Sequence, residues 1–163
     1  MSVRFLPLPH GVTWTHFRVV RTSPNGFQAQ TGYRIAASYR TAATGGEVSI
    51  SQAAVTVSLV PAQTWVVTGM KTPALLDHER LHYVIATLVG RELDRELAAL
   101  TGPNTATVLQ AADDLVLAKT DRALAIGSAY DDDTNHGEDI GQQRLWQGRV
   151  HGWEVDGNRV SWS

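Results

Sequence analysis

The chain has 163 residues, which is enough for one domain whose core can fold unaided. Its apolar content of 43% and charged content of 18% are ordinary for a globular protein, so wholesale disorder is not expected. The net charge of −2 gives no basic surface for nucleic acid, and no apolar run reaches the length of a membrane span. We therefore expect one domain over residues 1–163, without a nucleic-acid partner or a membrane span.

The chain start has one arginine and only a short apolar patch, broken by Pro7 and Pro9, which is not a secretory signal. By sequence the protein stays in the cytoplasm, is exported by another route, or is shown without its leader. The chain contains no cysteine, so any zinc ion must be held by histidine and carboxylate rather than by thiolate.

The first 70 residues have the composition of strands. Residues 14–20 are rich in aromatic and β-branched side chains, and residues 28–40 partly alternate between apolar and polar. In residues 48–59 the apolar positions change phase, which predicts a bulge or bend around Ala53 and Ala54. Residues 64–67 are a short fourth strand.

The second half is mainly helical. Thr72 is the expected N-cap of a helix that starts at Pro73 and ends at the Thr101-Gly102-Pro103 stop. A second helix, capped by Asn104 or Thr105, is expected to run antiparallel to the first until about Ala129.

A polar loop should follow over residues 130–137, then a short helix over 142–150 and a terminal hairpin over 151–163. Strands first and helices after predict an α+β fold, with an N-terminal antiparallel or mixed sheet packed on the two helices.

An H-E-x-x-H signature lies in the first predicted helix, as His78-Glu79-Arg80-Leu81-His82. Histidines four residues apart lie one above the other on a helix, so both imidazoles can reach one ion. Glu79 follows the first of them, where it can deprotonate a water bound to that ion. The apolar stripe that carries both histidines comprises Leu75, His78, His82, Ile85 and Val89. The alternative is a pair of core histidines with ordinary hydrogen bonds.

Two histidines do not complete a catalytic zinc site, which normally takes three protein ligands. Glu92 lies about 15 Å along the helix from His82, too far to join it. The third ligand is therefore expected from a segment that returns to the helix, and His136 in the polar loop is placed for that return.

At this point the sequence resembles a bacterial family, domain of unknown function 922, which is described as a predicted secreted zinc-dependent protease. Its members have an H-E-Q-G-H-F-like helix after a tryptophan-containing strand, and later Y-D-x-x-T-x-H-G and Q-x-x-W. The matching segments here are HERLHY (78–83), TWVV (64–67), YDDDTNHG (130–137) and QRLW (143–146). The resemblance covers about residues 12–150.

The chain departs from the family at Arg80 and Leu81, where members commonly have Gln and Gly. These are the two variable positions of the motif and carry no ligand role. The resemblance implies a zincin-like domain that is secreted or periplasmic, in contrast to the sequence at the chain start.

The resemblance implies that His78 and His82 bind zinc, that Glu79 is the general base, and that His136 is the third ligand. For His136 the alternative is a loop histidine that hydrogen-bonds a helix end. These residues would make the protein a zinc-dependent metallopeptidase that acts on a peptide or protein substrate.

Three neighbouring residues are candidates for supporting roles. Asp131 and Thr134 are expected to orient a ligand imidazole. The alternative for the run Asp131-Asp132-Asp133 is a solvated helix end, which is the preferred interpretation for Asp132 and Asp133. Tyr130 is expected to direct its phenol at a developing oxyanion, or to fill the core behind the loop. Gln143 and Trp146 are expected to serve packing rather than chemistry.

In the expected reaction Glu79 takes a proton from the zinc-bound water and passes it to the leaving amine. The substrate would lie extended along a sheet edge formed by the strand around Trp65 or by its neighbour. One alternative is a metal-binding structural or interaction module without turnover. Another is a zinc amide hydrolase that acts on a non-protein cell-wall substrate.

Overall fold

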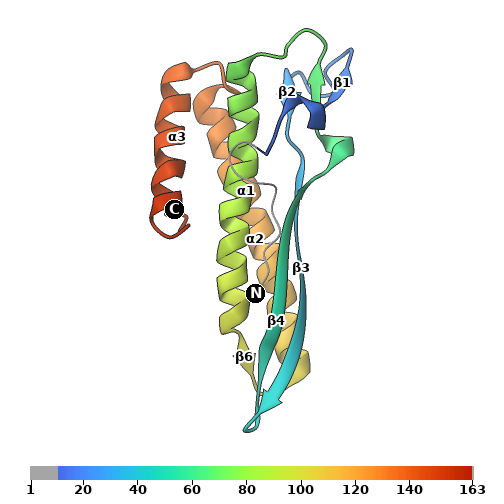
Figure 1. The fold of residues 1–163 in the computed structure, drawn as a ribbon, viewed down its shortest axis with the longest axis vertical. Helices are drawn as coiled ribbons and strands as arrows, with labels where there is room; N and C mark the ends of the chain where they lie inside the picture. The colour runs from blue at the N-terminus through green and yellow to red at the C-terminus, as the bar shows by residue number, and fades with distance from the viewer. Residues whose placement is uncertain (1–10, 163) are drawn as a thin grey trace.

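The computed structural model describes residues 11–162 (Figure 1). In chain order its elements are the 3₁₀ turn η1 (Trp14–His16), β1 (Arg18–Val20), β2 (Ala29–Gln30), β3 (Tyr33–Thr44), β4 (Glu47–Leu59), the 3₁₀ turn η2 (Pro61–Gln63), β5 (Trp65–Val67), α1 (Pro73–Ala99), β6 (Thr101–Gly102), α2 (Thr105–Thr134) and α3 (Ile140–Val155). The predicted α+β class is confirmed. The prediction about a leader concerns residues outside the described ones.

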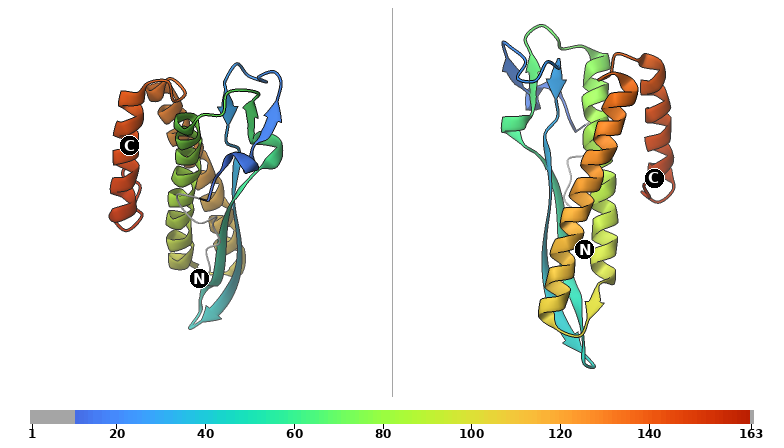
Figure 2. Two further views of the ribbon diagram at one scale, coloured as in Figure 1. Left: turned by 45° about the horizontal axis from the view of Figure 1, so that its top comes forward. Right: turned by 180° about the vertical axis from the view of Figure 1, so that it is seen from behind.

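The strands form two separate sheets rather than one N-terminal sheet. The long antiparallel hairpin β3–β4 carries β6 at its far end, while β1, β5 and β2 form a small mixed sheet with β5 in the centre. Figure 1 shows the hairpin alongside α1 and α2, with the small sheet at the end where α1 begins. In the rear view of Figure 2, α2 runs antiparallel beside α1, as predicted, and α3 packs beside their upper half.

The phase change in β4 is confirmed, but its position differs from the prediction. Arg40 pairs with Gln52 and Thr41 pairs with Ile50, so Ser51 is an extra residue in β4. Its hydroxyl donates to the carbonyl of Arg40 at 3.1 Å. The bulge lies two residues before Ala53, and it keeps the buried side chains before and after it on the same face.

The start of α1 is the predicted one. The Thr72 hydroxyl accepts a hydrogen bond from the Leu75 N–H at 3.1 Å, and Pro73 occupies the first turn, where its missing N–H costs no helical bond. The helix ends at Ala99, with Leu100 as its C-cap, directly before the predicted stop.

Helix α2 is longer than predicted, because residues 130–134 continue it instead of starting a loop. The Thr134 hydroxyl donates to the carbonyl of Tyr130 at 2.7 Å, and Asn135 closes the helix in a left-handed conformation with φ of 47°. The loop prediction was wrong for residues 130–134, because the run of polar residues was interpreted as a loop. Asn104 caps the helix as predicted, since its side chain accepts from the Thr107 N–H.

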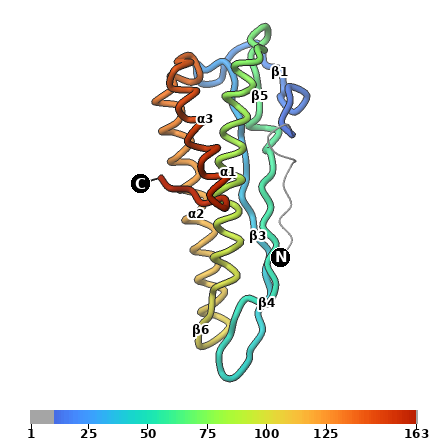
Figure 3. The backbone as a smooth tube through the Cα atoms, turned by 60° about the vertical axis from the view of Figure 1, so that its left-hand side comes forward, coloured from blue at the N-terminus to red at the C-terminus, as the bar shows by residue number. Residues whose placement is uncertain are grey.

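The two ends of the described chain also differ from the predictions. Residues 14–16 form η1, so only the last three residues of the predicted strand 14–20 belong to a strand, β1. Helix α3 continues to Val155, and none of the described residues 156–162 is a strand, so the predicted terminal hairpin is wrong. Figure 3 shows the chain turning back after α3. There the Arg95 guanidinium donates to the carbonyl of Asn158 at 2.9 Å.

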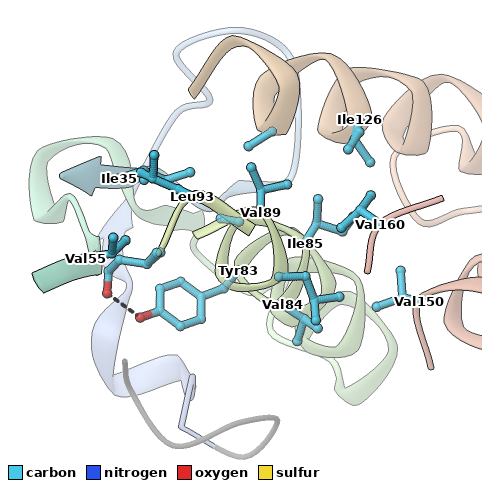
Figure 4. Close-up of a cluster of buried hydrophobic side chains, with 14 of the residues drawn as sticks. Ile35, Val55, Tyr83, Val84, Ile85, Val89, Leu93, Ile126, Val150 and Val160 are labelled. Atoms are coloured by element: carbon cyan, nitrogen blue, oxygen red, sulfur yellow. Dashed lines mark hydrogen bonds between the residues drawn. The ribbon is translucent and has the colours of Figure 1, made fainter. Parts of the chain in front are cut away.

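The core lies between α1 and its neighbours on all sides. Figure 4 shows buried side chains of α1 among residues of β3, β4, α2 and α3, with the hydrogen bond of Tyr83 dashed. The Tyr83 hydroxyl donates to the carbonyl of Val57 at 2.8 Å, which fixes α1 to β4. None of the helices within residues 11–162 combines the length and the apolarity needed to cross a membrane.

Leu93→Ala should lower the free energy of unfolding by about 2–5 kcal/mol, because the side chain is fully buried in this core. Leu117→Ala is the matched control: Leu117 is 63% exposed, and its removal should change stability by about 0.5 kcal/mol or less. Urea unfolding measures both. Equal effects of the two variants would contradict the packing described here.

Candidate metal centre

The predicted histidine pair lies in the second and third turns of α1, facing the end of α2. His78 is buried, with 2% of its side chain exposed, and His82 is 12% exposed. Their four-residue spacing places both Nε2 atoms 3.3 Å apart. Asp131, which α2 carries because that helix extends past Ala129, lies directly opposite the pair.

One carboxylate oxygen completes a compact triangle with the two imidazoles. Asp131 Oδ1 lies 3.0 Å from His78 Nε2 and 2.9 Å from His82 Nε2. Ligands of a tetrahedral zinc ion at about 2.0–2.1 Å are separated from one another by about 3.3 Å. Nitrogen and carboxylate oxygen are donors that zinc accepts. The donor set and its spacing therefore fit a metal ion, and this partly buried group of three residues is a candidate metal site.

Both imidazoles are packed against glycines. A Cβ built on Gly137 would lie 2.8 Å from Cγ of His78, and Gly137 has a φ of 86° that disfavours any other residue. A Cβ built on Gly127 would lie 3.3 Å from Nδ1 of His82. The two glycines thus let the α2 segment approach the rings closely enough to bring Asp131 to them.

Glu79 lies at the edge of the triangle and is almost completely buried, with 3% exposed. Its Oε2 accepts a hydrogen bond from the Thr31 hydroxyl at 2.6 Å. Burial raises the pKa of Glu79 above its ordinary value, and the charge of Asp131 acts in the same direction. Interactions with His82, Thr31 and His78 act against this rise. Glu79 is therefore a carboxyl group that can hold a proton more easily than a carboxyl group in water.

The pKa of Asp131 shifts in the opposite direction. Burial alone would raise it, but hydrogen bonds and charge from His78 and His82 hold the pKa well below its usual range. Burial would lower the pKa of His82, yet the bond to Asp131 and the charges of Asp131 and Glu79 raise it. Without a metal ion, the site therefore favours a proton on His82 and keeps Asp131 ionised.

Tyr130 lies behind the histidines and is fully buried. Its ring stacks on His78 with a centroid distance of 4.6 Å. Its hydroxyl donates to Oε1 of Gln143 at 2.7 Å and does not line the cleft described below. This position corresponds to the core-filling interpretation of Tyr130 rather than to an oxyanion donor.

His136 lies at the rim of the site, 36% exposed. Its Nδ1 is 3.6 Å from Asp131 Oδ1, and its ring packs at a tilt of 31° against Phe27 with centroids 3.9 Å apart. The three atoms that lie within 4.8 Å of one another come from His78, His82 and Asp131, so His136 is a neighbour of this group. Its predicted role as a ligand stays a prediction.

The triangle opens into a cleft of about 420 Å³. One wall is the segment from Phe27 to Tyr33, which includes β2, and the other is the C-terminal half of α2 with Leu124 and Ser128. His78, Glu79 and His82 form part of its lining. The cleft therefore gives a ligand access to the candidate metal site and to Glu79 together.

Sequence reasoning missed the role of Gln143 and the central place of Asp131. Gln143 was assigned to packing, yet its Oε1 is 3.1 Å from His78 Nδ1. Asp131 was expected to orient an imidazole, whereas its oxygen lies at the distance of a fellow ligand. Thr134 bonds the Tyr130 carbonyl and so stabilises the end of α2. Asp131 lies four residues after Gly127 on α2, and Gly127 packs against the imidazole of His82. This spacing is the signal that could have placed Asp131 beside the same imidazole.

Residues 63–137 match the family described as "Bacterial protein of unknown function (DUF922)". The family prediction made from the motifs is confirmed over these residues. Neither a curated protein nor a solved structure matches the chain. The matched segment contains the histidine pair, Glu79, Asp131 and His136, while α3 with Gln143 lies beyond it.

Gly137→Ala should weaken metal binding by roughly tenfold or more, because the new Cβ displaces the His78 ring from its position. Gly148→Ala is the control, since a Cβ there meets nothing within 4 Å and should stabilise α3 by about 0.5–1 kcal/mol. Titration of the metal-free variants with zinc, with a competing chelator, measures the affinities. Unchanged affinity in Gly137→Ala would contradict the proposed packing constraint.

Asp131→Ala should abolish stoichiometric metal binding, because it removes the oxygen that lies 2.9–3.0 Å from both imidazoles. His136→Ala tests the predicted third ligand in the same assay, which is elemental analysis of purified protein. If His136→Ala loses its zinc and Asp131→Ala keeps it, His136 rather than Asp131 is the third ligand. His151→Ala is a matched control, since this side chain is exposed and lies near Glu154.

Proposed function

We propose that this chain, whose residues 63–137 belong to the bacterial DUF922 family, is a zinc-dependent metallopeptidase with a zincin-like active site. The observation that carries the proposal is the shared location of a metal-binding triangle and a buried glutamate in one cleft. If the metal served only as a structural cross-link, the glutamate of the motif would not need to line a cleft that a ligand can enter. The position of Glu79 in the cleft therefore favours catalysis.

The protein side of the reaction follows from the residues around Glu79. His78, His82 and Asp131 would hold the ion, which when bound supplies Lewis acidity for the scissile carbonyl and for water. Thr31 occupies Oε2 of Glu79, so Oε1 is the oxygen that remains to accept a proton from the attacking water. The raised pKa of Glu79 then helps it to retain that proton until the leaving amine takes it.

The substrate class follows from the backbone of β2 and its flanks. The carbonyl of Gln28 accepts from the Val67 N–H at 2.8 Å, and the carbonyl of Gly32 accepts from the Val60 N–H at 2.8 Å. The even-numbered residues of this segment thus direct their backbone toward β5 and the turn before it. Of the two strands expected as a substrate edge, β5 is paired on both sides, whereas β2 is the outer strand of this sheet.

Backbone groups alternate in an extended segment, so Ala29 and Thr31 direct their N–H and C=O groups away from β5. Both residues line the cleft. Their separation of about 7 Å is the repeat with which an extended peptide adds to a sheet edge. This supports a peptide substrate over a non-peptide amide, which lacks such a backbone repeat.

Glu79→Gln should keep its zinc but lose peptide hydrolysis by roughly 10²–10⁴-fold, because the amide cannot accept the proton of water. Glu47→Gln, an exposed change at the hairpin turn, is the control and should leave both properties unchanged. Cleavage of denatured casein with and without a chelator, together with zinc content, measures the effect.

Two results would overturn the proposal. Normal hydrolysis by Glu79→Gln would remove the glutamate mechanism. Stoichiometric zinc without any hydrolysis in the unaltered protein, over a range of peptide substrates, would instead support the structural module without turnover.

A further inference from the structure

The outer edge of the small sheet continues along β3 without a change of phase. The Gly32 N–H donates to the Thr64 hydroxyl, directly before β5, at 3.2 Å. Further along, the Arg40 carbonyl accepts from the Ser51 hydroxyl of β4 at 3.1 Å. Even-numbered residues at both ends of this stretch therefore direct their backbone toward β5 or β4. Because backbone groups alternate in an extended strand, the odd-numbered residues from 29 to 39 direct their N–H and C=O groups to the other side.

These outward groups lie on an open edge that starts in the cleft. β3 is the outer strand of its sheet, as β2 is of the small sheet. Ala29, Thr31 and Tyr33 line the cleft, and Ile35 and Ala37 follow on the same edge. From 29 to 37 the edge is about 26 Å long, at about 3.3 Å per residue. Figure 1 shows β3 leading from the small sheet toward the far end of the hairpin. An extended chain that pairs with this edge would therefore reach the candidate metal site at one end.

Two exposed leucines of α2 lie beside this edge. Leu117 is 63% exposed and Leu124 is 56% exposed. Leu124 lines the cleft together with Tyr33. Leu117 lies one turn after Asp113, which accepts a hydrogen bond from the Tyr39 hydroxyl of β3, and residues four apart are neighbours on a helix surface. Leu117 therefore lies between two points at which α2 meets β3, and a chain added to the β3 edge would cover both leucines.

The opposite face of this edge is basic. Side chains alternate along a strand, so those of Arg34 and Arg40 lie on the face of β3 opposite to the buried Ile35. Both arginines are exposed, and within the described part of the chain neither forms an ion pair. Their partners on β4, Ser58 and Gln52, are uncharged. Acidic side chains of an added strand would meet these arginines as cross-strand neighbours.

We propose that the open edge over residues 29–37, together with Leu117 and Leu124, is an exosite that binds an extended segment of a protein substrate and leads it into the cleft. The segment would place apolar side chains toward α2 at alternate positions and acidic ones, between them, toward Arg34 and Arg40. The continuity of the edge with the cleft favours a substrate over a second copy of the chain. The inference deepens the proposed function, because it assigns unfolded protein segments rather than short peptides, and it rests on that function for cleavage alone.

The test measures peptide binding to the zinc-free full chain by fluorescence anisotropy. The probe is a fluorescein-labelled peptide of roughly ten residues that alternates valine and glutamate, and a peptide that alternates valine and lysine is its charge control. Ala37→Pro removes one outward N–H and places a ring on the edge, without taking a bond from the β3–β4 ladder. Leu117→Ala removes one apolar contact of the exosite. Leu145→Ala, on α3 and also 63% exposed, is the matched control.

We expect the valine–glutamate peptide to bind the unaltered protein more tightly than the valine–lysine peptide. Binding should weaken roughly fivefold in Leu117→Ala and roughly tenfold in Ala37→Pro, and it should not change in Leu145→Ala. Cleavage of denatured casein should fall in the same two variants, because a protein substrate would use the same edge.

Three results would overturn the inference. The first is absence of peptide binding by the unaltered protein, or a preference for the valine–lysine peptide. The second is unchanged binding by Leu117→Ala, which decides the question even if Ala37→Pro does not fold. The third is dimerisation of the unaltered protein in sedimentation velocity that Ala37→Pro abolishes, because the edge would then belong to a second copy. Peptide binding without casein cleavage would reject the metallopeptidase but keep the edge as a peptide-binding surface. Casein cleavage without peptide binding would reject the exosite alone.

Discussion

The contact on which this site depends is the one between the Asp131 carboxylate of α2 and two imidazoles of α1. It joins helices that are antiparallel and separated by the turn at β6, so it fixes one helix along the other. The contact requires close approach, which the glycines at 127 and 137 permit. On the opposite side of α1, the Tyr83 hydroxyl donates a hydrogen bond to β4 and so sets the distance between α1 and the β3–β4 hairpin. The cleft exists because α1 is held from both sides while its N-terminal turns remain accessible.

The sequence predicted the helix starts well because caps are local. Thr72 and Asn104 each bond a backbone N–H three residues ahead, and such contacts do not depend on the rest of the fold. The helix ends were harder to predict. The run of aspartates after Tyr130 has the composition of a loop, but Asp131 faces imidazoles and Asp133 accepts from the Trp146 indole at 2.9 Å. Tertiary partners, which a single sequence does not reveal, keep this segment helical.

The same distinction between local and tertiary contacts applies to the candidate metal site. The histidine pair and Glu79 are specified by spacing on one helix, so their arrangement could be derived directly. The position of Asp131 on α2 could not be derived in this way. The prediction placed residues 130–137 in a loop, which removed the helical geometry that brings Asp131 toward the histidines. His136 was then left as the expected third ligand. Gln143 was harder still. Its contact depends on how α3 docks, and a glutamine on a helix face gives no signal that it will meet an imidazole.

Glu79 and Asp131 both line this cleft, and their environments separate their roles. Asp131 accepts from both imidazoles, which lowers its pKa and keeps it an anion suited to hold a cation. Glu79 is more deeply buried and accepts a hydrogen bond from the Thr31 hydroxyl, which carries no charge, so burial prevails and raises the pKa of Glu79. Carboxyl groups whose pKa values are shifted apart in one site are typical of a division between binding and proton transfer. The opposite pKa shifts of Asp131 and Glu79 therefore support the proposed roles of Asp131 as ligand and of Glu79 as proton acceptor.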